Sequence, residues 1–346
     1  MDRQKFQEYL KTQKKERRIL TLPNILILLL LVIAGAVWYH FVANYLIASP
    51  DDKIFPPNAR LIKVVFFDVG QGDASLITTP DGKNIMIDAG STKGATIQES
   101  EEGTLITEID SAREVIIPYL RRNRITRLDA IIVTHPHVDH FGGFLEILDI
   151  PDIEIGLFVD NGLAVPNPYY EDLLKKVRAR RITYWTPRLN DLILPVKFSP
   201  GDDIEIKFLL PVTMFDSSDD ANINNSSLVA RLRYKNFTAL FTGDIETAAE
   251  LEILNWKTEL RSSILKVPHH GSQTSSSLPF LDMTAPQVAV ISCGRGNPYG
   301  HPHSVTIERL NRLGIKTLRT DESGTLIFTS DGIKFIWDTD TKDGRK

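Results

Sequence analysis

Three of the eight histidines in this 346-residue chain, His135, His137 and His140, fall within six positions, and Asp139 lies among them. Neutral imidazole and ionised carboxylate are the ligands that Zn²⁺ accepts in hydrolytic sites, and Mn²⁺ where carboxylate is more abundant. On a tight loop, His135 and His137 can face one side while Asp139 and His140 face a second, nearby position. The spacing therefore predicts a centre for two divalent metal ions, Zn or Mn, rather than histidines that cap surface turns.

The elements around this cluster must hold it in place. Ile131–Val133 is apolar and β-branched, which is typical of a buried strand, so the cluster follows a strand end. The pair Gly142-Gly143 predicts a turn into the next element. A helix is expected from about Phe144 to Leu148.

Two more predicted strands deliver histidines to loops. The strand Ile264–Pro268 ends in His269 and His270, and the strand Pro286–Ser292 leads to a loop with His301 and His303. His301 is either part of the centre or, with His303, only a cap for the helix that follows.

A fourth strand, Phe237–Thr242, is followed by Gly243 and Asp244. A carboxylate at a strand end suits a bridge between two metals, and the alternative is a cap for a helix over Glu246–Trp256. Three earlier strand ends carry Asp68, Asp73 and Asp88, which either orient metal-bound histidines or serve as turn residues.

Composition indicates a folded protein but no particular activity, with 42% hydrophobic and 24% charged residues. The single cysteine, Cys293, excludes an internal disulfide framework, and no disulfide-linked partner is expected. Residues 1–48 hold seven of the 40 Lys/Arg and three of the 44 Asp/Glu, which leaves 33 basic and 41 acidic residues in the body. An acidic body argues against nucleic-acid binding, although the basic run Lys175–Arg181 offers a local patch.

The N-terminal region predicts a membrane anchor. Residues 1–18 form a basic tail, and no Asp, Glu, Lys or Arg occurs from Leu20 to Ala48. Residues 19–48 are long enough to cross the ~30 Å hydrocarbon core of a bilayer as one helix. The positive flank predicts a cytoplasmic N-terminus and an extracytoplasmic body in a single-pass protein of the cell membrane. A cleaved signal peptide is the alternative.

A Pro-containing linker over 49–60 leads to the folded body at 61–340, and this body resembles the metallo-β-lactamase superfamily of hydrolases. Within that superfamily it is similar to the extracytoplasmic hydrolase domain of ComEC-type competence (DNA uptake) proteins. The resemblance implies an α+β fold, a four-layer αβ/βα sandwich. The N-terminal transmembrane helix predicted from the uncharged stretch precedes this fold. The motifs that carry it are Asp68–Asp73, Ile87–Gly90, Thr134–His140, Asn225–Val229, Thr242–Asp244, Lys266–Ser272 and Asn297–Pro302.

The resemblance also implies roles for residues. His135 and His137 would hold one metal, Asp139 and His140 the other, and Asp244 would bridge them. His269 or His270 would complete the second position, and the sequence does not choose between these neighbours. Asp139, Lys266, His269, His270 and His301 are the catalytic candidates.

One departure concerns the first metal. Many superfamily members place a third histidine between the His-rich loop and the bridging aspartate, yet no histidine occurs here between His140 and His269. Asn225 is the nearest matching position. Weak binding, or a contribution from His301 or from substrate, are the remaining explanations.

The expected function is a membrane-anchored, extracytoplasmic, metal-dependent phosphodiesterase or nuclease that uses a metal-bound hydroxide and is linked to DNA uptake. Its expected partners are a phosphodiester or nucleic-acid substrate and the lipid bilayer, through residues 19–48. Two alternatives stay open: a hydrolase of choline-phosphate esters, lactones or envelope components, and a degenerate metal-binding module without activity.

Overall fold

The computed structural model describes residues 54–100, 103–106, 109–188, 204–209, 215–255 and 259–340, together with positions 4, 7 and 8. The chain divides into two compact units, Met1–Ala59 and Arg60–Lys346. In the first unit, Gln4, Gln7 and Glu8 are helical. The anchor predicted over 19–48 lies outside the described residues, and none of the helices in the described part is both long and apolar enough to cross a bilayer.

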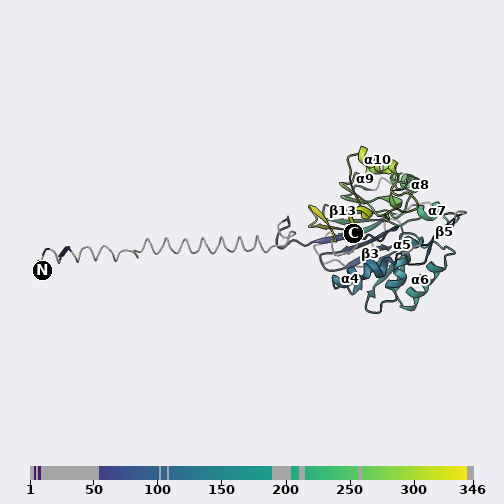
Figure 1. Cartoon of the computed structure of the whole chain (residues 1–346), viewed down its shortest axis with the longest axis horizontal. Helices are drawn as coiled ribbons and strands as arrows, with labels where there is room; N and C mark the ends of the chain where they lie inside the picture. The colour runs from purple at the N-terminus through teal and green to yellow at the C-terminus, as the bar shows by residue number, and fades with distance from the viewer. Residues whose placement is uncertain are drawn as a thin grey trace. The chain divides into compact units, whose positions relative to one another are not determined.

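Two sheets form the centre of the second unit (Figure 1). Period-two patterning with many β-branched and aromatic residues builds their strands. The first sheet has the order β10 (Thr183–Trp185), β9 (Leu157–Val159), β7 (Ala130–Ile132), β3 (Asn84–Ala89), β2 (Ala74–Thr78), β1 (Ile62–Phe66), β17 (Leu326–Ser330) and β18 (Phe335–Thr339). The second has the order β11 (Ile204–Leu209), β12 (Val229–Tyr234), β13 (Phe237–Phe241), β14 (Ile264–Lys266), β15 (Val288–Ile291) and β16 (Lys316–Arg319).

Two short ribbons accompany the sheets, β4 (Thr96–Ser100) with β5 (Gly103–Ile106), and β6 (Arg127–Leu128) with β8 (Glu154–Ile155). Helices cover the outer faces of the sheets (Figure 1). The helical elements on the first sheet are η1 (Ala112–Ile116), α4 (Ile117–Arg122), α5 (Val138–Ile147) and α6 (Pro168–Ala179). Those that follow in the chain are α7 (Asp220–Asn225), α8 (Thr247–Asn255), η2 (Pro268–Gly271), α9 (Leu278–Thr284), α10 (Ser304–Arg312) and α11 (Thr320–Ser323).

Strand alternation divides the interior into three cores. Val64 and Phe66 of β1 face the second sheet, whereas Val65 and Phe67, the residue after the strand, face the helices. In the second sheet, Leu240 faces away from the first sheet and belongs to the core that includes residues of α8 and α9. Helix, sheet, sheet and helix therefore form four layers, as expected of a chain whose strands are apolar on both faces. The predicted four-layer αβ/βα sandwich is confirmed.

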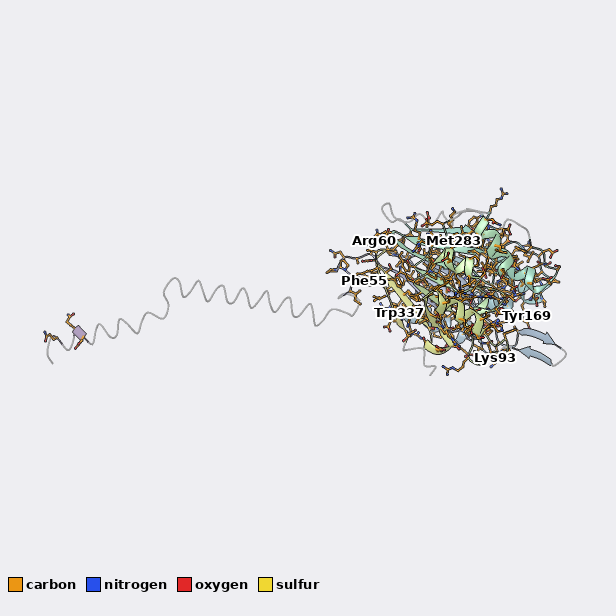
Figure 2. All side chains as sticks on the ribbon, turned by 90° about the horizontal axis from the view of Figure 1, so that it is seen from above. Phe55, Arg60, Lys93, Tyr169, Met283 and Trp337 are labelled. Carbon is orange, nitrogen blue, oxygen red and sulfur yellow. The ribbon has the colours of Figure 1, made fainter. Side chains whose placement is uncertain are left out.

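Strand direction brings the predicted site loops to one edge. Strands β13, β14 and β15 run parallel to each other, and β3 runs parallel to β7, so the residues after each strand in a group emerge at the same end. Lys93, shortly after β3, lies at the opposite end of the second unit from Arg60, where β1 is about to begin (Figure 2). The two sheets can thus present their polar loops to each other.

The prediction for residues after the histidine cluster is wrong in detail. Helix α5 begins at Val138, not near Phe144, and it includes Gly142 and Gly143, which were expected to form a turn. A Cβ atom on Gly143 would lie 2.2 Å from the carbonyl oxygen of Ala89, and one on Gly142 would lie 2.5 Å from Thr92 N. The glycines are there because α5 packs directly against the end of β3.

Candidate metal centre

The histidine motif spans a loop and the first turn of a helix. His135 follows β7, and His137 is the extended residue that precedes α5, with φ −90° and ψ 142°. Asp139 and His140 lie on the first turn of α5. The motif side chains stay close together: His135 offers a ligand atom within 4.8 Å of those of His140 and Asp244.

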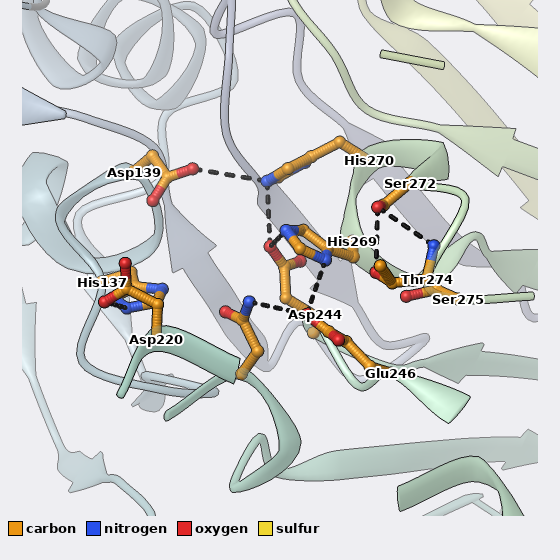
Figure 3. A network of polar contacts seen from close by, with 12 residues as sticks. His137, Asp139, Asp220, Asp244, Glu246, His269, His270, Ser272, Thr274 and Ser275 are labelled. Atoms are coloured by element: carbon orange, nitrogen blue, oxygen red, sulfur yellow. Dashed lines mark hydrogen bonds and ion pairs between the residues drawn. The ribbon is translucent and has the colours of Figure 1, made fainter. Parts of the chain in front are cut away.

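Asp139, His140, Asp244 and His270 converge on one point. His270 Nε2 lies 3.3 Å from Asp139 Oδ2 and 3.1 Å from Asp244 Oδ2, and the three side chains face each other in Figure 3. His140 Nε2 lies 3.2 Å from the same Asp244 oxygen. Asp139, His140 and His270 offer ligand atoms that all lie within 4.8 Å of one another. Four side chains from three separate segments therefore form a position that could hold a metal ion.

The paired histidines take different places. Both residues have a left-handed backbone, with φ 49° at His269 and 53° at His270, a conformation that non-glycine residues seldom adopt. His270 Nδ1 lies 3.0 Å from the carbonyl oxygen of Ser292, so it donates there and leaves Nε2 facing the cluster. His269 lies nearer the rim, with Nε2 3.9 Å from Asp244 Oδ2 and Nδ1 3.4 Å from Glu246 Oε1. The choice that the sequence left open thus has a geometric answer: His270 joins the buried cluster.

Two of the three strand-end aspartates contact histidines. Asp88 Oδ2 lies 2.9 Å from His140 Nδ1, and the same side chain accepts hydrogen bonds from the backbone and hydroxyl of Thr134. Asp73 Oδ1 lies 3.3 Å from His270 Nδ1. Asp68 instead accepts from the backbone of Gly70 in a turn. Asp88 is therefore placed to orient the His140 imidazole, Asp73 lies beside the His270 imidazole, and Asp68 is a turn residue.

Lys266 is buried against the carboxylates of Asp73 and Asp244. Its Nζ pairs with Asp73 and lies 3.5 Å from Asp244 Oδ1, and it also donates to the carbonyl oxygen of Gly243. Burial alone would lower the pKa of Lys266, but the carboxylates of Asp73 and Asp244 raise it above its ordinary value. The residue is a fixed, buried positive charge that balances these carboxylates.

His135 and His137 form a second group beside the first. His135 Nε2 lies 3.0 Å from His137 Nδ1. Asn225 is the position that the sequence analysis matched to the missing third histidine. Asn225 is used elsewhere: its Oδ1 accepts from the backbone N–H groups of Glu246 and Ala249 at the start of α8, and its Nδ2 donates to Ala221. The Asn225 side chain therefore faces α8 and does not reach the histidine pair.

Of the two histidines in the loop after β15, His301 lies at the metal centre and His303 does not. His301 is buried, and its ring centroid lies 5.5 Å from that of His269 and 6.0 Å from that of His270. Burial, reinforced by the neighbouring histidines, lowers the pKa of His301 to about 3, so its imidazole is neutral near pH 7. His303 precedes α10, and its Nδ1 accepts from the backbone of Gln273. His301 is thus brought to the centre, whereas His303 acts in the loop.

The chemistry of the cluster fits a divalent cation. The Nε2 atoms of His140 and His270 are buried without a hydrogen-bond partner, and they point at carboxylate oxygens. Burial would raise the pKa of Asp139, but the His140 and His270 imidazoles hold it below its usual range. Burial would lower the pKa of His140, but Asp244 and Asp88 raise it well above its usual range. The carboxylates and imidazoles thus favour positive charge between them, which a divalent cation would supply.

Comparison with known proteins agrees with this geometry. The sequence pattern of the family described as Metallo-beta-lactamase superfamily matches residues 67–295. The chain belongs to the metallo-beta-lactamase superfamily. The matched region includes Asp139, His140, Asp244 and His270, which are the residues that converge in the structure.

Three curated relatives resemble this superfamily member along most of its length. The ComE operon protein 3 of Bacillus subtilis is 31% identical over 274 residues, which are 79% of this chain and 34% of the relative. The competence protein ComA of Neisseria gonorrhoeae is 28% identical over 79% of this chain and 33% of its own length. Recombination protein 2 of Haemophilus influenzae is 32% identical over 74% of this chain and 27% of its own length. The resemblance to ComEC-type proteins is confirmed, and the chain spans about a third of the length of these relatives.

Sequence reasoning missed two contacts at the rim of this metallo-beta-lactamase centre. Asp220 Oδ1 lies 3.6 Å from His137 Nε2, and the two side chains lie together in Figure 3. Glu246 lies beside His269, as given above. Asp220 belongs to a stretch rich in Asp, Asn and Ser, a composition that is typical of a polar loop. The signal available was Asp219, which caps α7 through the backbone N–H of Asn222.

Proposed function

We propose that this chain is a metal-dependent phosphodiesterase or nuclease. The observation that carries the proposal is the convergence of Asp139, His140, Asp244 and His270 on one buried position. His135 and His137, whose Nε2 and Nδ1 atoms lie 3.0 Å apart, would hold a second ion. Divalent cations in such a centre lower the pKa of water and polarise a phosphoryl oxygen.

The residues around the metal centre orient its histidines and balance its charge. Asp88 and the Ser292 carbonyl oxygen fix the His140 and His270 rings through Nδ1. Lys266 balances the carboxylates Asp73 and Asp244 from below, so that the negative charge of the centre is limited before substrate arrives. These groups set geometry and charge without contact to substrate.

His269 is the group placed to move a proton. It is partly exposed at the rim, and Glu246 Oε1 lies 3.4 Å from its Nδ1. Its Nε2 then faces the centre and can give a proton to a departing alkoxide oxygen. His301, buried and neutral beside it, offers a hydrogen bond to a phosphoryl oxygen without adding charge.

The substrate class is inferred from the relatives. One of them is named a competence protein and another a recombination protein, and both names concern DNA. We therefore propose DNA, or another phosphodiester, as the substrate in preference to choline-phosphate esters and lactones.

We also propose that residues 19–48 anchor the protein as a single helix in the cell membrane, with the tail 1–18 in the cytoplasm and the hydrolase body outside. The support is the absence of charged residues from Leu20 to Ala48 and the basic flank before them. Protease added to intact spheroplasts should then release the body and leave the tail protected. Protection of the body would contradict this topology.

The activity is tested with the purified full chain. After removal of metal with a chelator, we expect added Mn²⁺ or Zn²⁺ to restore cleavage of single-stranded DNA and of bis(p-nitrophenyl) phosphate. Asp139→Asn should lose this activity, because it removes a carboxylate from the converging group. Asp152→Asn, at an exposed turn, is the matched control. Hydrolysis of a lactone or choline-phosphate ester alone, or full activity in Asp139→Asn, would contradict the proposal.

A further inference from the structure

The histidine pair at the first metal position has an incomplete set of partners among the residues considered so far. His135 Nδ1 lies 3.2 Å from Ser227 Oγ and 3.1 Å from Thr134 Oγ1, so it has hydroxyl partners and its Nε2 faces His137. Two imidazole nitrogens then face one point. A four-coordinate site needs at least one more protein ligand, together with Asp244 or water.

Helix α7 is the element beside this pair. Asp220, its first residue, has Oδ1 3.6 Å from His137 Nε2, which is within ion-pair range. In a helix, residues i and i+4 lie on the same face, so Asn224 shares the face of Asp220. Helical spacing therefore places Asp220 and Asn224 on the same face of α7.

The Asn224 side chain has an unused oxygen. The residue is 5% exposed, its Nδ2 donates to Glu246 Oε1 at 3.3 Å, and its Oδ1 is buried without a hydrogen-bond partner. Buried amide oxygens are nearly always satisfied, so this one points to a ligand or an ordered water.

Asn224 is also tied to the histidine pair through its backbone. Its carbonyl oxygen accepts from Ser227 Oγ at 2.7 Å, and the same hydroxyl contacts His135 Nδ1 and accepts from Asp244 N. One serine thus links Asn224, the first histidine and the bridging aspartate. Asn225, the next residue, points the other way, toward α8.

We propose that α7 completes the first metal position: Asn224 Oδ1 is its third ligand, in the place of the histidine that this chain lacks, and Asp220 is a positioning residue that orients His137 through Nε2. This assignment deepens the proposed function and rests on its metal centre. An amide oxygen is a harder ligand than imidazole and suits Mn²⁺ better than Zn²⁺. The first position is therefore selective for Mn²⁺.

The test measures metal binding, not turnover. Calorimetric titration of the chelator-treated full chain should give two sites for Mn²⁺. In Asn224→Leu, which has similar volume and no donor, we expect one site to weaken by at least tenfold and the other to stay unchanged. Asp220→Asn should weaken the same site by about tenfold, as loss of an orienting carboxylate does, and Asp220→Glu should recover most of it.

The most discriminating variant is Asn224→His, which supplies the missing imidazole. It should tighten Zn²⁺ binding at the first position by at least tenfold and change the visible spectrum of the Co²⁺-loaded protein. A purely structural role of Asn224 would produce neither effect. Asn222→Ala, on the same helix but bonded to Asp216 and Ser218, is the control and should leave both sites intact.

Unchanged affinities in Asn224→Leu, or no gain of Zn²⁺ affinity in Asn224→His, would overturn the assignment. Thermal unfolding of the metal-free variants checks that each one folds. If the metal results hold but no phosphodiester is cleaved, the proposed function fails and the assignment of Asn224 and Asp220 stands.

Discussion

Asp88 and His140 form a buried pair in which the carboxylate oxygen Oδ2 lies 2.9 Å from the imidazole Nδ1. Asp88 comes from the end of β3 and His140 from the first turn of α5. The hydrogen bond fixes which nitrogen of His140 carries the proton and turns the other nitrogen toward Asp244. This geometry is the one by which carboxylates orient histidine ligands in metalloproteins.

Replacement of Asp88 by Asn should weaken metal binding at the second position by about 10–100-fold, as expected for loss of an orienting carboxylate. The affinity is measured by calorimetric titration with Mn²⁺ or Zn²⁺. Asp152→Asn, at an exposed turn, should leave it unchanged. Equal affinities in Asp88→Asn and the parent chain would mean that Asp88 only caps Thr134.

Replacement of Lys266 by Met should destabilise the metal-free protein. It would leave Asp73 and Asp244 buried without their cation, and breaking such a pair from one side costs about 3–5 kcal/mol. Urea unfolding in the presence of a chelator gives this free energy. Lys175→Met, on the exposed face of α6, should change it by less than about 0.5 kcal/mol. A small effect in Lys266→Met would show that the carboxylates are neutralised in another way.

Replacement of Gly143 by Ala should push α5 away from β3. The new Cβ would lie 2.2 Å from the Ala89 carbonyl oxygen, and such overpacking costs about 1–3 kcal/mol. Because His140 is on the same helix, metal affinity should fall together with stability. Glu146→Ala changes a partly exposed residue of the same helix and serves as the control. An unaffected melting temperature in Gly143→Ala would contradict the close packing of α5 on β3.

Cys293 should resist alkylation in the native protein. The thiol follows β15, is fully buried, and has a pKa that burial and the neighbouring Asp321 raise to about 12. The reactive thiolate is therefore scarce at pH 8, and iodoacetamide should modify Cys293 only after unfolding in urea. Mass spectrometry of the native and unfolded protein measures this. Rapid labelling of the native protein would refute the buried position.

The four-layer sandwich was expected from the resemblance to the metallo-β-lactamase superfamily, and the local alternation of side chains along the strands gives its physical reason. The pattern Ile62, Val64 and Phe66 against Val65 and Phe67 makes both faces of β1 apolar, and this requires a covering layer on each side. The histidine motif likewise carries its chemistry in its residue types, so a metal centre with His135, His137, Asp139 and His140 could be predicted without coordinates.

Other features depend on segments that are far apart in the sequence. The pattern did not separate His269 from His270, because the choice depends on two left-handed residues and on the Ser292 carbonyl oxygen, which lies 22 positions away. The local pattern of Gly142-Gly143 is typical of a turn, but both glycines belong to α5. They are glycines because the end of β3 leaves no room for side chains at these positions.

The sequence by itself determined the fold class, the ligand types and the absence of a third histidine before Asp244. Only the tertiary structure decided that Asn225 caps α8, that Asp220 Oδ1 lies 3.6 Å from His137 Nε2, and that Asn224 Oδ1 is buried without a hydrogen-bond partner. The physical reason is that the directions of side chains on a short helix depend on where the helix begins. Asp219 marks this start for α7, but it lies among Asp, Asn and Ser residues whose composition is equally typical of a polar loop.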